Sequence, residues 1–336
     1  MEAYFHRMTE IMDGEAVAAG LRDDLRSSIE TLADHGHRPG LATILMSDDP
    51  ASETYVNMKQ KDCEEVGIEG VHVEIDPNEP PQKLYDTIED LNADPEVHGI
   101  LIQQPLPDYV NSRAVIRRVD PVKDVEAMHP ENIGRFVAGY ARYRPCTPFG
   151  VQHLLEEYDI DTQGWDVTIV GHSDIVGKPL ANLMVQKQEG PDGSAGEPHA
   201  TVTICHVETQ DLAEKTRNAD VVVVATGVPE LIDGSMITEG TVVVDVGINQ
   251  VEADNEKGYE LVGDVDFESA KEKASYITPV PGGVGAMTRA MLLYNTVKAA
   301  RIQTGIDVDL PSFCKGGIPP YTPEAQTHPP AEAADR

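Results

Sequence analysis

Short apolar runs, separated by helical patterns, recur along this chain. In its second half the runs are mostly β-branched and cover 166–170, 201–205, 221–225 and 241–246. Continuous runs of this kind are typical of parallel strands, because such strands are buried on both faces of their sheet. Strands that alternate with helices predict βαβ units. We therefore expect an α/β fold built on parallel sheets.

The first half shows the same alternation and predicts a domain of its own. Strands are expected at 41–46, 71–75 and 98–103, and helices at 50–66 and 82–91. Residues 144–150 resemble a linker ahead of a helix at 151–158, so we place the domain junction there. A chain of 336 residues is long enough for two domains. We expect them at 1–148 and 149–287.

Three segments are expected to lie outside the packed domains. Residues 189–199 are rich in Gly, Pro, Ser and acids, which predicts a solvated insertion. Residues 305–336 carry many prolines and few large aliphatics, which predicts a poorly ordered tail. Residues 1–7 resemble an extension, since Met8 offers a second possible start.

The net charge of the chain excludes some classes of partner. It has 58 acidic and 26 basic residues, which gives a formal charge of −32. Phosphates and anionic lipids would be repelled, so we expect no nucleic-acid and no membrane partner. Acidic chains are often disordered, but 40% of these residues are hydrophobic. We interpret the acidity as the surface of a folded protein from a salt-adapted organism, where salt screens self-repulsion.

The cysteines indicate a reduced compartment. Cys63, Cys146, Cys205 and Cys314 lie far apart and form no metal-binding pattern with histidine. No stretch approaches 18 apolar residues, and the N-terminus lacks the layout of a signal peptide. We expect a cytoplasmic protein without a metal.

The turn after the run at 166–170 has the features of an anion-binding loop. It reads Gly-His-Ser-Asp-Ile-Val-Gly-Lys-Pro from Gly171, and glycine there permits close approach of the backbone to a pyrophosphate. The spacing matches neither GxGxxG nor a P-loop, so an ordinary glycine-rich turn stays an alternative. Glycines after the runs at 221–225 and 241–246 favour nucleotide binding, because ligands bind at the carboxyl edge of open α/β sheets.

Two segments in the first half carry groups suited to chemistry on a planar ring. Tyr55 and Lys59 are four residues apart and share one face of the expected helix. An aromatic ring beside an amine suits a heterocycle, although such a pair is also common on a solvated helix face. Gln103 ends a strand in Gln-Gln-Pro-Leu-Pro, where its amide either binds a ligand or satisfies a turn.

Two loops complete the set of candidate segments. Asp124 and Glu126 lie in Lys-Asp-Val-Glu-Ala, which alone indicates only a solvated loop. Residues 278–288 contain three glycines and two prolines ahead of a helix at 289–300. So cramped a loop indicates close approach to a ligand, and capping of that helix by Thr288 is the alternative.

Taken together and in this order, the five segments resemble the bifunctional methylenetetrahydrofolate dehydrogenase/methenyltetrahydrofolate cyclohydrolase family over residues 8–303. The resemblance implies a Rossmann-type C-terminal domain, a folate cleft between two α/β domains, and a last helix at 288–304 that returns to the N-terminal domain. It implies oxidation of 5,10-methylenetetrahydrofolate with NADP⁺ and hydrolysis of the product to 10-formyltetrahydrofolate, in one-carbon metabolism. It also implies a homodimer.

The resemblance assigns roles to individual residues. Lys59 matches the lysine that manages protons during hydrolysis, Gln103 the glutamine that tunes it, and Tyr55 the aromatic that orients the folate. The implied substrate-binding residues are Tyr55, Asp124, Glu126, Pro281, Gly282 and Gly283. The implied cofactor-binding residues are Gly171, His172, Ser173, Ile175, Thr226 and Ile248.

The chain departs from the family pattern at several of these positions. His172 stands in place of an arginine, and Val207 in place of a serine, with Glu208 beside it. An arginine would bind the 2′-phosphate of NADP⁺ with two hydrogen-bond donors. Because this chain has no arginine at that position, NAD⁺ stays an alternative to NADP⁺. Glu126 replaces an aspartate that contacts the pterin, which leaves open whether the longer carboxylate does that work. Ala286 replaces a proline.

Two other functions remain as alternatives. A folate- or nucleotide-binding protein without catalysis would not need both Lys59 and Gln103. A Rossmann dehydrogenase acting on another small acid, such as a shikimate-type enzyme, would account for the second half of the chain. It would leave the motifs at 55–61 and 103–107 without a purpose.

Overall fold

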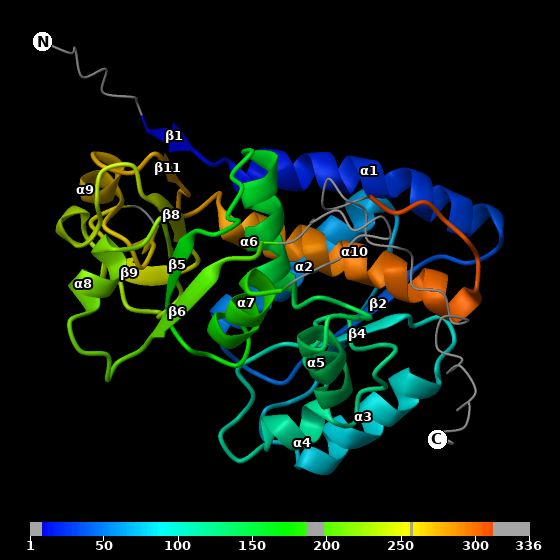
Figure 1. Ribbon diagram of the computed structural model, residues 1–336. Coiled ribbons are helices and arrows are strands. Elements are labelled where there is room, and N and C mark those ends of the chain that lie inside the picture. Colours follow the sequence, from blue (N-terminus) through cyan, green and yellow to red (C-terminus); the bar gives the residue numbers. More distant parts are fainter. Residues whose placement is uncertain (1–8, 187–197, 256–257, 312–336) are drawn as a thin grey trace, which may run out of the picture.

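The computed structural model of this protein describes residues 9–186, 198–255 and 258–311. One α/β domain lies at one end of a pair of long helices, and the other lies below these helices in the view of Figure 1. Most of the expected insertion, the expected extension at 1–7 and the tail beyond 311 lie outside the described residues. In the described part, no helix is long and apolar enough to cross a membrane.

The N-terminal domain is built on a parallel sheet of order β3-β2-β4. Its strands are β2 (Gly40–Leu45), β3 (Glu69–Glu74) and β4 (Gly99–Ile102), and its connecting helices are α2 (Pro50–Val66) and α3 (Pro81–Ala93). The short helices α4 (Ser112–Ile116) and α5 (Pro130–Val137) follow. Because β2 and β4 pair in parallel, the start of α2 and the end of β4 lie at one edge of the sheet.

The second domain contains a six-stranded parallel sheet of order β1-β11-β8-β7-β5-β6. Its strands are β1 (Glu10–Ile11), β5 (Asp166–Val170), β6 (Thr201–Cys205), β7 (Val221–Val224), β8 (Val242–Asp245) and β11 (Tyr276–Ile277). Strand β1 pairs with β11, so the beginning of the chain completes the sheet of the second domain. This pairing was not expected from the sequence.

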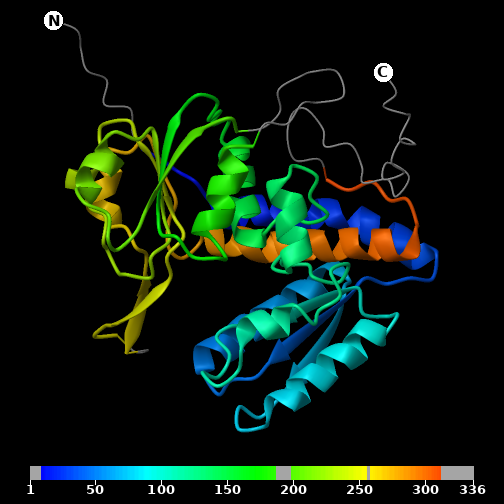
Figure 2. The ribbon, with the colours of Figure 1, turned by 60° about the horizontal axis from the view of Figure 1, so that its bottom comes forward.

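Helices and a hairpin surround this sheet. The helices are α6 (Cys146–Glu157), α7 (Gly177–Met184), α8 (Leu212–Arg217) and α9 (Phe267–Lys271), with a 3₁₀ turn at Gly234–Met236. Strands β9 (Asn249–Glu252) and β10 (Tyr259–Val262) pair as an antiparallel hairpin that projects from the domain (Figure 2). The mixed architecture with parallel sheets confirms the predicted fold class.

The two long helices, α1 (Gly14–Asp34) and α10 (Val284–Thr304), run side by side between the domains (Figures 1 and 2). Helix α1 was not predicted, although Leu21, Leu25 and Leu32 form a buried stripe at helical spacing. Its N-cap, Asp13, accepts a hydrogen bond from the backbone N–H of Ala16.

Helix α10 begins at Val284, five residues before the start expected from the sequence pattern and four before the start implied by the resemblance. Thr288 therefore lies one turn inside the helix, and its hydroxyl bonds to Val284 O and to Thr147 Oγ1. The alternative that Thr288 caps this helix is wrong. Helix α6 likewise begins at Cys146 and not at 151, because Pro148 falls in the first turn, where no backbone donor is needed.

Candidate functional site

Two of the predicted catalytic side chains are in direct contact. Lys59 Nζ, on α2, donates a hydrogen bond of 3.0 Å to Oε1 of Gln103, directly after β4. Gln103 Nε2 donates to the carbonyl of Gln104 at 2.7 Å, which fixes the amide with its oxygen toward the lysine. This hydrogen bond connects α2 with the end of β4, which lie at the same edge of the first sheet. The amine is thereby held in a defined position at the carboxyl edge of the first sheet.

The loop that carries Asp124 and Glu126 lies beside this pair. Burial raises the pKa of Glu126, and the charge of Lys59 opposes that rise while Asp124 adds to it. Asp124 is buried, and its oxygens accept hydrogen bonds from Met128 N, His129 N and Asn132 Nδ2. The charge of Lys59 thus influences the pKa of Glu126, and Asp124 organises the loop through its three hydrogen bonds.

Tyr55, one helical turn before Lys59 on α2, lines a cavity of about 420 Å³. The predicted residues that line it are Tyr55, Ile248, Pro281, Gly282 and Gly283. Ile248 was expected at the cofactor, and the structure places it in this cavity. The volume lies in the range of small-molecule sites. The sequence predictions missed Glu15 and Arg289, which also line the cavity.

Burial raises the pKa of Tyr55, and the charge of Arg289 opposes the rise. Arg289 pairs with Asp62 at 3.1 Å and with Glu15 at 3.5 Å. Its guanidinium thus lies where α1, α2 and α10 meet, and Arg289 lines the same cavity as Tyr55. Only a tertiary contact reveals this, because a single arginine after Met-Thr carries no pattern of its own.

The loop after β5 is folded so tightly that only glycine fits. Gly171 has a φ of +127°, and a Cβ there would lie 2.2 Å from Ala225 O. A Cβ on Gly177, at the start of α7, would lie 2.1 Å from Gly171 O. This close backbone packing lies at the carboxyl edge of β5 and β7, and residues 172–175 of the loop are exposed.

The other predicted cofactor residues lie along the same edge. Ser173 Oγ accepts a hydrogen bond from Val176 N at 3.1 Å, and the Ile175 side chain is exposed. The Nδ1 atom of His206, after β6, accepts a hydrogen bond from Glu208 N at 3.2 Å. The ring of His172 lies 4.9 Å from that of His206, centroid to centroid. Because Nδ1 of His206 accepts the hydrogen bond from Glu208 N, a neutral His206 ring carries its hydrogen on Nε2.

Two buried aspartates that were not predicted organise this edge. Asp264 Oδ2 accepts hydrogen bonds from Thr226 N and Gly227 N, and its Oδ1 accepts one from Asn249 Nδ2. Asp245, at the end of β8, accepts three backbone N–H bonds, and burial raises its pKa to about 6. For Asp245, the sequence offered one signal, which is an acidic residue directly after the run of valines in β8.

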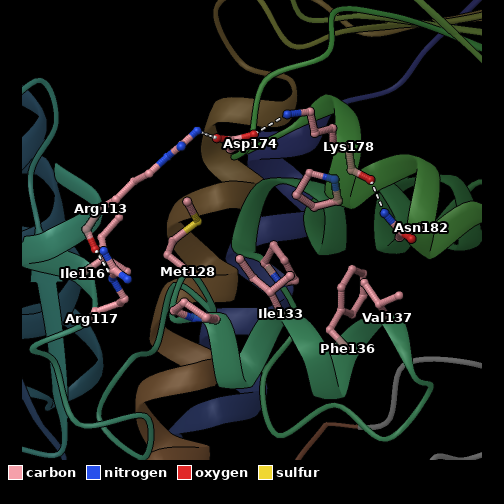
Figure 3. A pocket seen from close by; sticks show the side chains of 13 residues that line it. Arg113, Ile116, Arg117, Met128, Ile133, Phe136, Val137, Asp174, Lys178 and Asn182 are labelled. Atoms are coloured by element: carbon pink, nitrogen blue, oxygen red, sulfur yellow. Dashed lines mark hydrogen bonds and ion pairs between the residues drawn. The ribbon is translucent and has the colours of Figure 1, made fainter.

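A second cavity of about 550 Å³ lies between α4, α5 and α7 and shares no lining residue with the first (Figure 3). At its rim Asp174, in the loop after β5, pairs with Lys178 at 2.5 Å and with Arg113 of the N-terminal domain at 3.5 Å. These side chains are largely exposed, so the pairs contribute little to stability. Within the described residues no group of side chains is arranged to hold a metal ion.

The fold and the site define a two-domain α/β protein with a tight glycine loop at the edge of a six-stranded parallel sheet and a lysine–glutamine pair next to a cavity. Residues 12–126 match the catalytic domain of tetrahydrofolate dehydrogenase/cyclohydrolase, and residues 145–304 match the NAD(P)-binding domain of the same family. The chain belongs to this family, as its sequence motifs predicted.

Curated relatives from salt-adapted archaea are similar along most of the chain. The bifunctional protein FolD of Natronomonas pharaonis is 68% identical over 304 residues, which cover 90% of this chain and 100% of that protein. Bifunctional protein FolD 1 of Haloarcula marismortui is 65% identical with the same coverage. These relatives confirm the predicted salt-adapted origin.

Solved structures share the fold. A bifunctional FolD from Campylobacter jejuni has a TM-score of 0.81 and 43% identity, covering 88% of this chain and 99% of that one. The enzyme of Trypanosoma brucei, solved with NADP and an inhibitor, has a TM-score of 0.82 and 34% identity, with the same two coverages. Both support the two-domain arrangement.

Proposed function

We propose that this protein oxidises 5,10-methylenetetrahydrofolate to the 5,10-methenyl compound by hydride transfer to a nicotinamide dinucleotide, and hydrolyses that product to 10-formyltetrahydrofolate. The observation that carries the proposal is the hydrogen bond between Lys59 and Gln103, one turn from Tyr55 in the cavity wall. A protein that only binds folate has no use for an amine held in place by an amide.

Hydrolysis needs two proton movements at neighbouring atoms. Water adds to the methenyl carbon and loses a proton, and the bond from that carbon to N5 then breaks as N5 gains a proton. Lys59 serves both movements, because Gln103 holds its Nζ in place and Glu126 lies close enough for the charge of Lys59 to influence the pKa of that carboxyl. Tyr55 orients the aromatic part of the folate by stacking.

The residues along the second sheet fit a dinucleotide. Gly171 permits the close approach, Ser173 shapes the loop, and Thr226 is fixed by Asp264. A dinucleotide held by these residues would supply the nicotinamide ring as the acceptor for the hydride of the methylene carbon. The exposed Ile175 side chain offers an apolar surface at the same edge.

The preferred cofactor in this proposal is NADP⁺, with NAD⁺ as the second candidate. The relative from Trypanosoma brucei binds NADP. The end of the second Rossmann strand contacts the adenosine ribose, and an acid there favours NAD⁺. Here that position holds Glu208, whereas His172 and His206 offer ring N–H donors to a 2′-phosphate.

The cofactor preference can be measured directly. We expect kcat/KM to be higher for NADP⁺ than for NAD⁺, and Glu208→Gln to widen the difference by removing a charge that repels the phosphate. His172→Arg should widen it further, because a guanidinium binds phosphate with two donors. A wild-type preference for NAD⁺ would reverse the assignment.

The overall activity is tested by following methenyltetrahydrofolate with either cofactor, in low and in molar salt. We expect the compound to form from the methylene substrate and then to decay faster than it does without enzyme. If neither cofactor supports formation and the supplied methenyl compound decays at its uncatalysed rate, the protein is not this enzyme.

We also propose a homodimer that forms through the edge strand β6. Three of its five side chains, those of Thr201, Thr203 and Ile204, are exposed. Among the residues that the structure describes, β6 is an edge strand of its sheet, and an unpaired edge is a site for association. Sedimentation should give twice the mass of the chain, and Ile204→Lys should shift the equilibrium toward the monomer. A wild-type monomer at micromolar concentration would contradict the proposal.

A further inference from the structure

In the proposed function the substrate occupies the cavity of about 420 Å³ that Tyr55 lines. The only cationic side chain among the described residues that line this cavity is that of Arg289. The other charged lining residues are Glu15 and Asp245. The substrate in the proposed function carries a glutamate tail with two carboxylates. In a chain of net charge −32, such a tail needs a specific positive group at the place where it binds.

The two partners of Arg289 differ in their exposure. Asp62 lies 3.1 Å from Nη1, and its side chain is only 9% exposed. Glu15 lies 3.5 Å from Nη2, and its side chain is 53% exposed. A long pair with an exposed partner contributes little, so the outer half of the guanidinium can exchange Glu15 for another carboxylate at small cost. The inner half stays fixed by Asp62.

The order of groups along the site matches the order of groups in a folate. In the proposed function Lys59 acts at the one-carbon bridge, and Tyr55, one turn before it on α2, stacks on the aminobenzoyl ring. Arg289 is close enough to Tyr55 to affect its ionisation, and it lines the same cavity. The group attached to the aminobenzoyl ring is the glutamate.

We propose that Arg289 forms a carboxylate subsite that binds the glutamate tail of the substrate, and that Glu15 occupies this subsite when the substrate is absent. The proposal rests on the proposed function and adds the residue that recognises the tail. Arg289 selects the acid form of the substrate, while Lys59 and Gln103 act on the one-carbon unit.

The test compares 5,10-methylenetetrahydrofolate with its diamide, in which both glutamate carboxylates are carboxamides of nearly the same size. We expect the wild-type protein to favour the acid by about 10- to 100-fold in kcat/KM, mostly through KM. In Arg289→Gln this ratio should fall close to one. The ratio is informative even if the variant is less active overall.

Two further variants separate recognition from structure. Arg22 also pairs with Glu15, at 3.4 Å, and its side chain is 8% exposed, but it does not line the cavity. Arg22→Gln removes the same charge from the same helix junction and should keep the wild-type ratio. Glu15→Gln removes the competing carboxylate and should raise the ratio a few-fold, which keeps the proposal testable if Arg289→Gln does not fold.

Three results would overturn the subsite. They are equal use of both substrates by the wild type, an equal loss for both substrates in Arg289→Gln, and a ratio that Glu15→Gln leaves unchanged. A wild-type protein that turns over neither substrate would instead contradict the proposed function, and the subsite with it.

Discussion

Lys59 Nζ lies 3.0 Å from Gln103 Oε1, although 44 residues separate them in the chain. The contact is a consequence of topology. Helix α2 follows β2, Gln103 follows β4, and these two strands are parallel neighbours whose carboxyl ends meet at one edge. The order of the strands thus brings Lys59 and Gln103 into contact, although neither residue alone indicated a site in the sequence.

Replacing Lys59 with methionine should abolish hydrolysis of the methenyl compound. The variant keeps the length of the side chain and removes the amine that moves protons in the proposed mechanism. We expect the rate to fall by at least about 100-fold, the usual contribution of general acid–base catalysis. The decay of methenyltetrahydrofolate absorbance measures it.

Lys61→Met is the matched control for that variant. Lys61 lies two residues further along α2, and its side chain is exposed. The substitution removes the same charge from the same helix, so hydrolysis should continue at close to the wild-type rate. Equal losses in both variants, or full activity in Lys59→Met, would remove Lys59 from its catalytic role.

The sequence predicted the regular elements well where the pattern was local. The bounds of β5, β6 and α2 agree with expectation, because each is a continuous run or a capped helix. Helix α1 was missed because its polar face is highly charged. Strand β1 was missed because a strand of two residues is too short to show an alternating pattern. Only pairing with β11, 266 positions away, makes them a strand.

The sequence predicted the motif residues of the site and missed the groups that support them. Lys59 and Gln103 belong to recognisable motifs. Asp264 and Arg289 act through partners that are distant in sequence, such as Thr226 for Asp264 and Glu15 for Arg289. Tertiary structure alone creates those contacts, so no pattern in one sequence could indicate them.

Gly171→Ala should destabilise the protein by about 3 kcal/mol, because the added Cβ meets Ala225 O at 2.2 Å and the residue has a positive φ. Cofactor affinity should fall as the loop shifts. Gly20→Ala is the control, since a Cβ there meets nothing within 4 Å inside α1. It should stabilise by about 0.5–1 kcal/mol, as urea unfolding would show. Equal effects of the two substitutions would contradict the packing argument.

The raised pKa of Asp245 makes stability depend on pH in a particular direction. Burial raises its pKa from 3.8 to about 6, so the folded state holds the proton more tightly than the unfolded state between these values. The wild type should therefore gain about 2 kcal/mol over Asp245→Asn as the pH falls from 7.5 to 4.5. Urea unfolding of both proteins at each pH measures it, and a difference independent of pH would disprove it.

Salt should stabilise the fold by screening its own charge. A net charge of −32 repels itself across the surface, and the screening length falls from about 10 Å at 0.1 M salt to about 3 Å at 1 M. We expect the melting temperature to rise steeply between 0.1 and 2 M KCl at pH 7. Near the pI of 4.5 most of that charge is neutralised, so the rise should be much smaller. A rise of equal size at both pH values would mean that salt acts by strengthening apolar burial and not by screening.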